Sequence, residues 1–195
     1  MFLGHKSRCF DVRVNGNGAR ALSASEDGTC KLWDIESKAL QATLIHDSDS
    51  EVLRAVFLST SENEKEMVVS CGSNGKAIVW RMNEETSFYQ QTLQLAHTTE
   101  QIYVCEAVLS SPIAMQAHLM TADEESVYIW NLDSPSFPLL TKSFASLSTS
   151  TQGFGGDRNP ENKVFIFDCK FAPQQSSVGA NSIGAALSDG NNLYY

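Results

Sequence analysis

Residues 22–34 read LSASEDGTCKLWD, and this pattern recurs along the chain. Two further stretches align with it without gaps: 69–81, VSCGSNGKAIVWR, and 119–131, LMTADEESVYIWN. Each copy ends one residue after one of the chain's tryptophans, which are 47 and 50 residues apart: Trp33, Trp80 and Trp130. A period of this length indicates a repeat architecture, in which each unit buries its apolar face against its neighbours.

A fourth copy lies at 185–195, which reads AALSDGNNLYY. Asp189 stands six residues before Tyr195, the same offset that separates Asp27 from Trp33, so an aromatic residue fills the tryptophan position. We therefore expect four repeats along the chain, at about 5–45, 46–95, 97–144 and 163–195.

Each repeat contains short runs of strand-forming residues. The first runs are 9–14, 52–58, 102–109 and 164–171, and the last ones are 39–45, 88–95 and 138–144. Between the second and third runs, three copies carry a turn of the type that favours a β-hairpin: Asp27-Gly28, Asn74-Gly75 and Asp189-Gly190. With four short runs per repeat and no helical period, the pattern predicts an all-β fold built of four-stranded antiparallel units.

A histidine precedes each of the first three repeats, 28, 34 and 33 residues before the tryptophan: His5, His46 and His97. The pair Gly4-His5, followed by Trp33-Asp34, resembles the Gly-His and Trp-Asp signature of the WD40 repeat family. The resemblance extends along the chain from Gly4 to Tyr195, except for 141–162.

The resemblance implies a WD40-type β-propeller, partial, with three full four-stranded blades and most of a fourth. Members of the family usually close a ring of about seven blades. We therefore expect the chain to be a fragment, an alternative isoform or an N-terminal piece of a longer protein, or to need another chain to close the ring. The Ser-, Thr- and Gly-rich stretch 141–162 is predicted to be a flexible insert between the third and fourth blades. Its glycines at 153–157 lack the Lys-Ser/Thr ending of a phosphate-binding loop.

The resemblance also implies a buried hydrogen-bond network in each blade, made by the histidine, a hydroxyl, the turn acid and the tryptophan. It assigns to these networks His5, Ser23, Asp27 and Trp33; His46, Ser70, Asn74 and Trp80; His97 and Trp130; and Asp189. In the third repeat, Met120 stands at the hydroxyl position with Thr121 beside it, and Glu124 stands at the acidic position.

Because the same set of residues recurs in several repeats, we interpret it as structural and not as a catalytic triad, of which one active site needs one copy. The histidines fall on separate blades, so they would not converge on a metal ion. We therefore predict no catalytic residue, no metal site and no cofactor.

Composition narrows the class of protein. The chain has 195 residues, a net charge of −9 and scattered basic residues, which argues against direct binding to nucleic acid. No apolar run reaches about 18 residues and no signal peptide is visible, so we expect no membrane insertion. The cysteines Cys9, Cys30, Cys71, Cys105 and Cys169 show no metal-ligand spacing, and we expect free thiols in a cytoplasmic or nuclear protein.

The resemblance suggests a partner-binding face on the loops that enter the first strand and on the turns between the second and third strands. The residues at these places are Arg8, Phe10, Glu26, Glu51, Leu53, Ser73 and Tyr103. Exposed aromatic residues and arginine there would serve as anchors. In the alternative interpretation, Phe10 and Leu53 point into the blade core. The acidic run 61–66 is interpreted as a solvated hairpin loop, with contact to a basic partner as its alternative.

The sequence therefore predicts a non-enzymatic scaffold that binds other proteins within a larger complex. One alternative is a substrate receptor of a cullin-type ubiquitin ligase, but the arginine that this variant carries shortly after Trp-Asp is missing, since Ile35-Glu36 follows Trp33-Asp34. Another is an enzyme or small-molecule binder, which would gather its groups around the central channel. There the first runs offer only isolated charges: Asp11, Arg13, Asp168 and Lys170.

Overall fold

The computed structural model describes residues 3–58, 66–83, 85–97, 101–109, 117–124, 126–132, 138–143, 187–188 and 193–194. These residues form strands, turns and connecting segments. Within them, no helix is long and apolar enough to cross a membrane.

Three antiparallel sheets of four strands make up most of this structure. Blade 1 contains β1 (Cys9–Val14), β2 (Arg20–Ser25), β3 (Thr29–Asp34) and β4 (Leu40–Ile45). Blade 2 contains β5 (Val52–Leu58), β6 (Met67–Gly72), β7 (Lys76–Met82) and β8 (Tyr89–Ala96). Blade 3 contains β9 (Val104–Leu109), β10 (Ala117–Ala122), β11 (Ser126–Asn131) and β12 (Leu140–Ser143). A two-stranded sheet pairs β13 (Leu187–Ser188) with β14 (Leu193–Tyr194).

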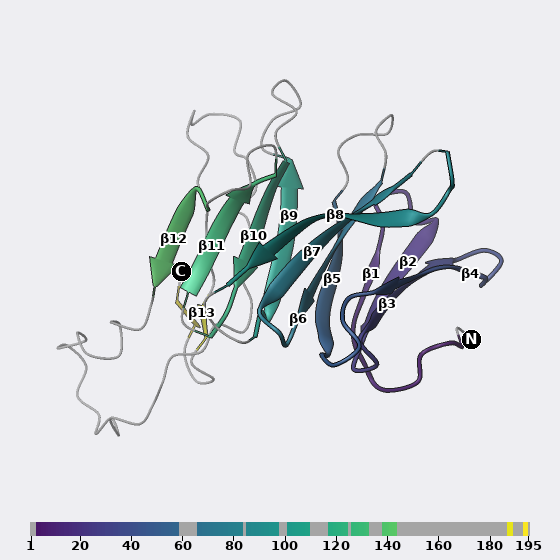
Figure 1. Cartoon of the computed structure of the whole chain (residues 1–195), viewed down its shortest axis with the longest axis horizontal. Coiled ribbons are helices and arrows are strands. Elements are labelled where there is room, and N and C mark those ends of the chain that lie inside the picture. The colour runs from purple at the N-terminus through teal and green to yellow at the C-terminus, as the bar shows by residue number, and fades with distance from the viewer. Residues whose placement is uncertain are drawn as a thin grey trace.

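Strands that follow one another in the chain are neighbours in each sheet, so every blade is a meander. The first strand of blade 2, β5, contacts the first strands of the other two blades, β1 and β9. The three blades consequently stand side by side in chain order, as Figure 1 shows. The predicted all-β, partial propeller is confirmed: the described blades form an arc and not a closed ring.

The turns between the second and third strands explain why the hairpins form at these places. Gly28 and Gly75 adopt positive φ angles of 77° and 69°, which a residue with a Cβ rarely adopts. The side chains of Asp27 and Asn74 accept hydrogen bonds from backbone N–H groups two residues further on, at 3.1 and 3.2 Å. At Gly28 space is short as well, because a Cβ would lie 2.2 Å from the carbonyl oxygen of Asp47.

Two apolar clusters join the blades. The first lies between blades 1 and 2 and includes Leu22, Leu32, Val52, Val68 and Trp80. The second lies between blades 2 and 3 and includes Val69, Cys71, Leu119, Tyr128 and Trp130. Blade 2 is thus covered on both faces, which is why all six residues of β6 are buried instead of alternating with exposed ones.

A polar contact also joins blades 1 and 2, at the start of β6. The carboxylate of Glu66 accepts hydrogen bonds from Arg20 Nη1 at 2.9 Å and from Asn15 Nδ2 at 3.0 Å, both on blade 1. The hydroxyl of Tyr89 on blade 2 donates to the same carboxylate at 3.2 Å. Burial, followed by the nearby Glu66 charge, raises the pKa of Tyr89 to about 12, so this hydroxyl keeps its proton.

Several sequence expectations fall outside the described residues. They are the run 164–171 with Asp168, Cys169 and Lys170, the glycines at 153–157, and the fourth-repeat residues Asp189 and Tyr195. Of the stretch 141–162, only the first three residues are described, and they belong to β12. Of the acidic run 61–66, only Glu66 is described.

Candidate functional site

The buried polar residues of blade 1 form one continuous chain of hydrogen bonds. Trp33 Nε1 donates to the Ser23 hydroxyl at 2.9 Å, and Ser23 Oγ lies 2.7 Å from Nε2 of His5. The other ring nitrogen of His5, Nδ1, lies 2.9 Å from a carboxylate oxygen of Asp27. All four predicted residues of this repeat are therefore in contact.

Blade 2 repeats this chain and adds one member. Trp80 Nε1 donates to Ser70 at 2.8 Å, and Ser70 lies 2.8 Å from Nδ1 of His46. Nε2 of His46 lies 3.2 Å from Oδ1 of Asn74, whose amide group donates in turn to Asp47 at 3.1 Å. The carboxylate that ends the chain is therefore not at the turn, where the amide stands, but on the residue after the histidine.

In blade 3 the structure corrects the ungapped alignment. Trp130 Nε1 donates to Thr121 at 2.8 Å, and Thr121 lies 2.6 Å from Nε2 of His97. Nδ1 of His97 lies 3.1 Å from Asp123. The hydroxyl and acid of this network are thus Thr121 and Asp123, and the residues aligned at these places, Met120 and Glu124, have other positions.

The shift has a simple cause in the hairpin of blade 3. Four residues separate the pair Ala122 and Val127 that closes its turn, whereas five separate Ala24 from Cys30 in blade 1, and blade 2 matches blade 1. A turn that is one residue shorter moves every position before it by one, so the hydroxyl is found nine residues before the tryptophan. The threonine stands at the shifted place, but the acid does not follow the shift: Asp123 is seven residues before Trp130, whereas Asp27 is six before Trp33, so it occupies a different place in the turn.

The electrostatics of the networks differ between blades. Burial opposes the charge of Asp27 and is the largest single influence, but hydrogen bonds from Thr29, the Lys6 backbone and His5 together hold its pKa well below the usual range. In blade 2, burial lowers the pKa of His46, and the bond to Asn74 only partly offsets this. Blade 1 therefore places a charged carboxylate against its histidine, whereas blade 2 places a neutral amide there and ends the network on Asp47.

The hydroxyls of these networks are poorly placed for nucleophilic chemistry. Ser23, Ser70 and Thr121 are 5%, 0% and 0% exposed, and each one accepts from a tryptophan as well as contacting a histidine. A nucleophile needs a free approach for the reacting atom, which these groups do not have. Among the described residues, no cluster of His, Cys, Asp or Glu could hold a metal ion.

A second set of predicted residues lies at the end of the blades where the chain enters the first strands. The pairing of β1 with β2 shifts between Cys9 and Asp11, and that of β5 with β6 shifts between Val52 and Arg54. Phe10 and Leu53 are therefore the extra residues of two equivalent β-bulges, which re-aim a side chain. Tyr103 directly precedes β9.

These bulges decide between the two interpretations of the predicted face. Phe10 is 42% exposed and Leu53 is half-buried, and neither belongs to the apolar clusters between the blades. Their side chains consequently lie at the surface or its margin, and not in the blade core. By contrast, Ala55, which pairs in regular register on the same strand as Leu53, is buried between the blades and is 1% exposed.

Each blade also forms a polar contact between the entering segment and the turn after its second strand. In blade 1, Arg8 pairs with Glu26. In blade 2 the backbone N–H of Glu51 donates to the Ser73 hydroxyl at 3.0 Å, and in blade 3 the Tyr103 hydroxyl donates to Glu124 at 3.1 Å. We name this surface the loop edge and define it by the seven predicted residues: Arg8, Phe10, Glu26, Glu51, Leu53, Ser73 and Tyr103. The structure adds two members that the sequence did not suggest, Gln101 and Glu124, both bonded to Tyr103.

The contact in blade 1 is charged and bidentate. Nε and Nη2 of Arg8 donate to the two oxygens of Glu26 at 3.0 and 2.8 Å. The Ser7 hydroxyl and the Arg8 backbone N–H donate to the same carboxylate. The Arg8 hydrogen bond, with smaller help from Ser7, lowers the pKa of Glu26 to about 2.

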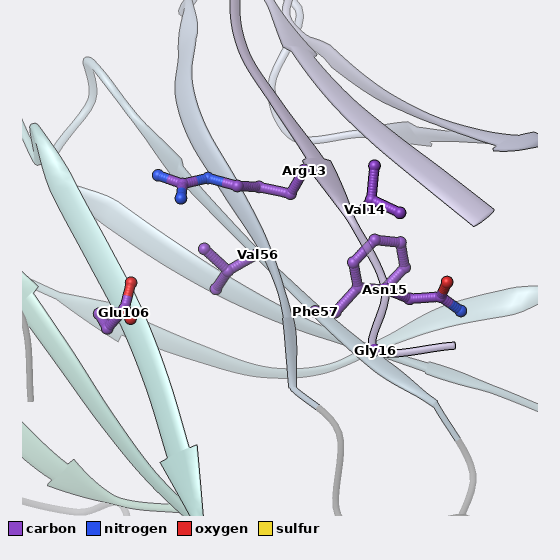
Figure 2. A pocket seen from close by; sticks show the side chains of 7 residues that line it. All are labelled: Arg13, Val14, Asn15, Gly16, Val56, Phe57 and Glu106. Carbon is purple, nitrogen blue, oxygen red and sulfur yellow. The ribbon is translucent and has the colours of Figure 1, made fainter. Parts of the chain in front are cut away.

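A pocket also opens along the first strands of the blades, where a propeller enzyme would gather its reacting groups. Figure 2 shows its seven lining residues, which come from β1, the segment after it, β5 and β9: Arg13, Val14, Asn15, Gly16, Val56, Phe57 and Glu106. The Arg13 guanidinium is already engaged, because its Nε donates to Asp11 at 3.1 Å. The lining thus combines apolar walls with one engaged cation and one carboxylate, and it holds no Ser, Cys or His.

A family model described as WD40, WD domain, G-beta repeat, matches residues 1–34 of the chain. This segment matches a WD40 repeat. The matched segment contains His5, Ser23, Asp27 and Trp33, the four residues of the blade 1 network. The resemblance inferred from the sequence is therefore confirmed.

Curated relatives can also be aligned with the chain over longer segments. The chain is 36% identical over 81 residues to the guanine nucleotide-binding protein subunit beta of Saccharomyces cerevisiae, which covers 41% of the chain and 19% of the relative. It is 27% identical over 139 residues to the target of rapamycin complex subunit wat1 of Schizosaccharomyces pombe, covering 69% of the chain and 41% of the relative. The chain thus spans less than half the length of these curated relatives.

A solved structure, that of the RRP9 WD40 repeats, resembles the chain with a TM-score of 0.59 at 15% identity. The match covers 74% of the chain and 41% of the solved one. At this level of identity the similarity supports the propeller fold alone.

Proposed function

We propose that this protein is a non-enzymatic WD40-repeat scaffold that binds other proteins through the loop edge. The observation that carries the proposal is the repetition of one surface arrangement on three consecutive blades, with bulged or strand-preceding apolar side chains beside polar pairs. A row of such positions presents one continuous surface to a partner. One relative is itself named as a subunit of a complex, the target of rapamycin complex subunit wat1, which supports a scaffold.

We further propose that the hydrogen-bond networks hold the blades together and take no part in chemistry. Each network ties the segment before the first strand to the second and third strands, as His5 does by contacting Ser23 and Asp27. A fully bonded buried network fixes strand register, and its partial loss is costly. The burial of every hydroxyl in these networks supports this role.

Charge and thiol chemistry support the proposed class of partner and compartment. The loop edge carries one arginine against Glu26 and Glu51, so it lacks the basic character that nucleic acid requires. Four cysteines are described and all are free thiols, three of them buried, which agrees with a cytoplasmic or nuclear location. The motif argues against the ligase-receptor alternative, because no arginine follows Trp33-Asp34 within the next two residues.

The test is affinity purification of the full chain from an extract of the cells that make it, with the captured proteins quantified by mass spectrometry. The double variant Arg8→Ala/Glu51→Ala removes two charges of the loop edge. We expect it to lose at least about tenfold of the specifically captured protein, as for interface residues that each contribute more than about 1 kcal/mol.

The matched control is Phe88→Ser. Phe88 is 73% exposed and directly precedes β8, the outermost strand of blade 2, away from the loop edge. This variant should capture the same proteins as the unchanged chain. Equal capture by the double variant, or loss with Phe88→Ser alone, would overturn the proposed site.

A further inference from the structure

Arg8 is held in one orientation at the surface. Its guanidinium group donates from Nε and Nη2 to the two oxygens of Glu26, which fixes the plane of the group. A free surface arginine loses side-chain entropy when a partner immobilises it, whereas a fixed one has lost most of that freedom already. Arg8 is therefore preorganised for contact.

Glu26 fixes the orientation of Arg8, and its carboxylate can accept few further hydrogen bonds from a partner. Its carboxylate accepts from the Arg8 side chain twice, from the Arg8 backbone N–H and from the Ser7 hydroxyl. The side chain of Glu26 is 26% exposed, against 76% for that of Arg8. The arginine is thus the member of the pair that faces outward.

One face of the guanidinium is already next to an aromatic ring. The Cζ atom of Arg8 lies over the Phe10 ring, 5.9 Å from its centroid, within the range of a cation–π contact. The bulge at Phe10 brings the ring there. Since Glu26 binds the group from its edge and most of the Arg8 side chain is exposed, the face opposite Phe10 is open to a partner.

The surrounding charge limits what that open face can take. Glu26 neutralises Arg8, and Glu51 on the neighbouring blade is also close enough to raise the pKa of Arg8, after the larger effect of the Glu26 bond. A carboxylate or phosphate on the partner would meet two carboxylates beside one cation. A neutral ring avoids this repulsion and still gains from the cation through its π electrons.

We infer that Arg8 anchors an aromatic side chain of the partner protein, which stacks on the guanidinium face opposite Phe10. The result is a three-layer stack of Phe10, Arg8 and the partner's ring. This inference rests on the proposed function and names the chemistry of the partner: a segment that exposes Trp, Tyr or Phe, without an acidic residue at the point of contact.

The experiment uses the full chain labelled with nitrogen-15 and follows the Nε–H signal of Arg8 by NMR. The probe is N-acetyltryptophanamide, and the comparison probes are N-acetylleucinamide and acetate. We expect the tryptophan probe to move the Arg8 signal upfield through its ring current and in a saturable manner. Equal or larger saturable shifts with N-acetylleucinamide or acetate would overturn the inference.

Two variants and a control separate stacking from charge. Arg8→Lys keeps the cation and loses the planar group, so the tryptophan probe, followed by backbone signals of the loop edge, should bind about two- to fivefold more weakly. Glu26→Gln releases the arginine and should weaken binding in the same direction. Arg13→Lys changes an arginine that is bonded to Asp11 in the channel and should leave binding unchanged. Unaltered binding by Arg8→Lys contradicts the inference.

The outcome for the aromatic anchor is distinct from that for the proposed function. If capture of proteins depends on Arg8 and Glu51 but the tryptophan probe does not shift the Arg8 signal, the loop edge is a binding surface without an aromatic anchor. If capture does not depend on the loop edge, the proposed function fails whatever the probe does.

Discussion

Blades 1 and 2 use the same strand order and the same Trp–Ser–His chain, yet they end it differently. Blade 1 places a carboxylate, Asp27, directly against its histidine. Blade 2 places a neutral amide, Asn74, against His46, and the carboxylate follows one step later at Asp47. The comparison shows that the blade needs a continuous chain of donors and acceptors, whereas the position of the charge can vary.

The two tryptophans also lie in different surroundings. Trp80 belongs to the apolar cluster between blades 1 and 2. Trp33 lies outside both clusters between blades and is covered by the segment before β1, where a Cβ on Gly4 would come within 2.9 Å of the Trp33 ring. Equivalent residues of a repeat thus differ in what covers them, and their contributions to stability should differ accordingly.

The largest expected effect is the loss of the tryptophan between blades. Trp80→Ala should lower the free energy of unfolding by about 3–5 kcal/mol, since it leaves a cavity between two blades and removes one of the hydrogen bonds of Ser70. Trp33→Ala should cost less, because the short segment over it can collapse onto the smaller side chain. Denaturant unfolding of both variants measures the difference, and equal losses would contradict the contrast between the two positions.

The next prediction converts a residue of blade 2 into its equivalent in blade 1. Gly72 pairs with Val52 as Ser25 pairs with Cys9. A Cβ at Gly72 would lie 2.6 Å from Nε2 of His46, so Gly72→Ser should lower the free energy of unfolding by about 1–3 kcal/mol through overcrowding.

The control is the reverse change, Ser25→Gly, followed by the same unfolding measurement. It creates no crowding and should cost the bonds of the Ser25 hydroxyl to the Ser7 and Arg8 carbonyls and to the Asp27 N–H, together with the backbone entropy that a glycine loses on folding. A Gly72→Ser variant as stable as the unchanged chain would show that the His46 ring can move aside.

A smaller effect is expected from moving the charge of blade 2 to its place in blade 1. Asn74→Asp would replace the donor to Asp47 by a second carboxylate, 3.1 Å from the first in the present geometry. We expect it to destabilise the chain at pH 7 by less than Gly72→Ser. The added change Asp47→Asn should restore stability, because it supplies a neutral group to face the new carboxylate. Additive losses in this double-mutant cycle would contradict the proposed contact.

The smallest expected effect is the pH dependence that separates the two networks. Burial lowers the pKa of His46, so the unfolded chain binds the proton more readily, and stability falls as the pH drops below about 6.5. The lowered pKa of Asp27 also acts in the acid direction, but only as the pH falls below about 3.9. Unfolding free energies from pH 8 to 5 should decline for the unchanged chain and decline less for His46→Gln. Parallel curves would contradict the assignment.

Much of the fold follows from the sequence because each repeat has the same order of strand-forming runs and turns. The runs 9–14 and 52–58 coincide with β1 and β5, and the Gly turns coincide with the hairpins after β2 and β6. These features depend on nearby residues, so local patterns suffice to predict them. The network residues of blades 1 and 2 could be named because the resemblance to the WD40 family implies them and both hairpins have the same length.

The third repeat shows where this reasoning ends. One residue fewer in its turn moved the hydroxyl to Thr121, and the acid, Asp123, comes from a different place in the turn, so an alignment by tryptophan alone cannot detect either change. Likewise, Asp47 has no equivalent in the hydrogen-bond network of blade 1, so the repeat pattern gave no reason to assign it to the network of blade 2.

The sequence by itself determined the repeat, the all-β class, the strands and the likeness of the first two networks, because each depends on spacing within about 50 residues, the length of one repeat. Only the tertiary structure decided which residues meet at the loop edge, since the bulges that expose Phe10 and Leu53 are register shifts between strands. It also decided which tryptophan is covered by a neighbouring blade. Burial and pairing across blades arise when separate units pack together, and no single repeat contains that information.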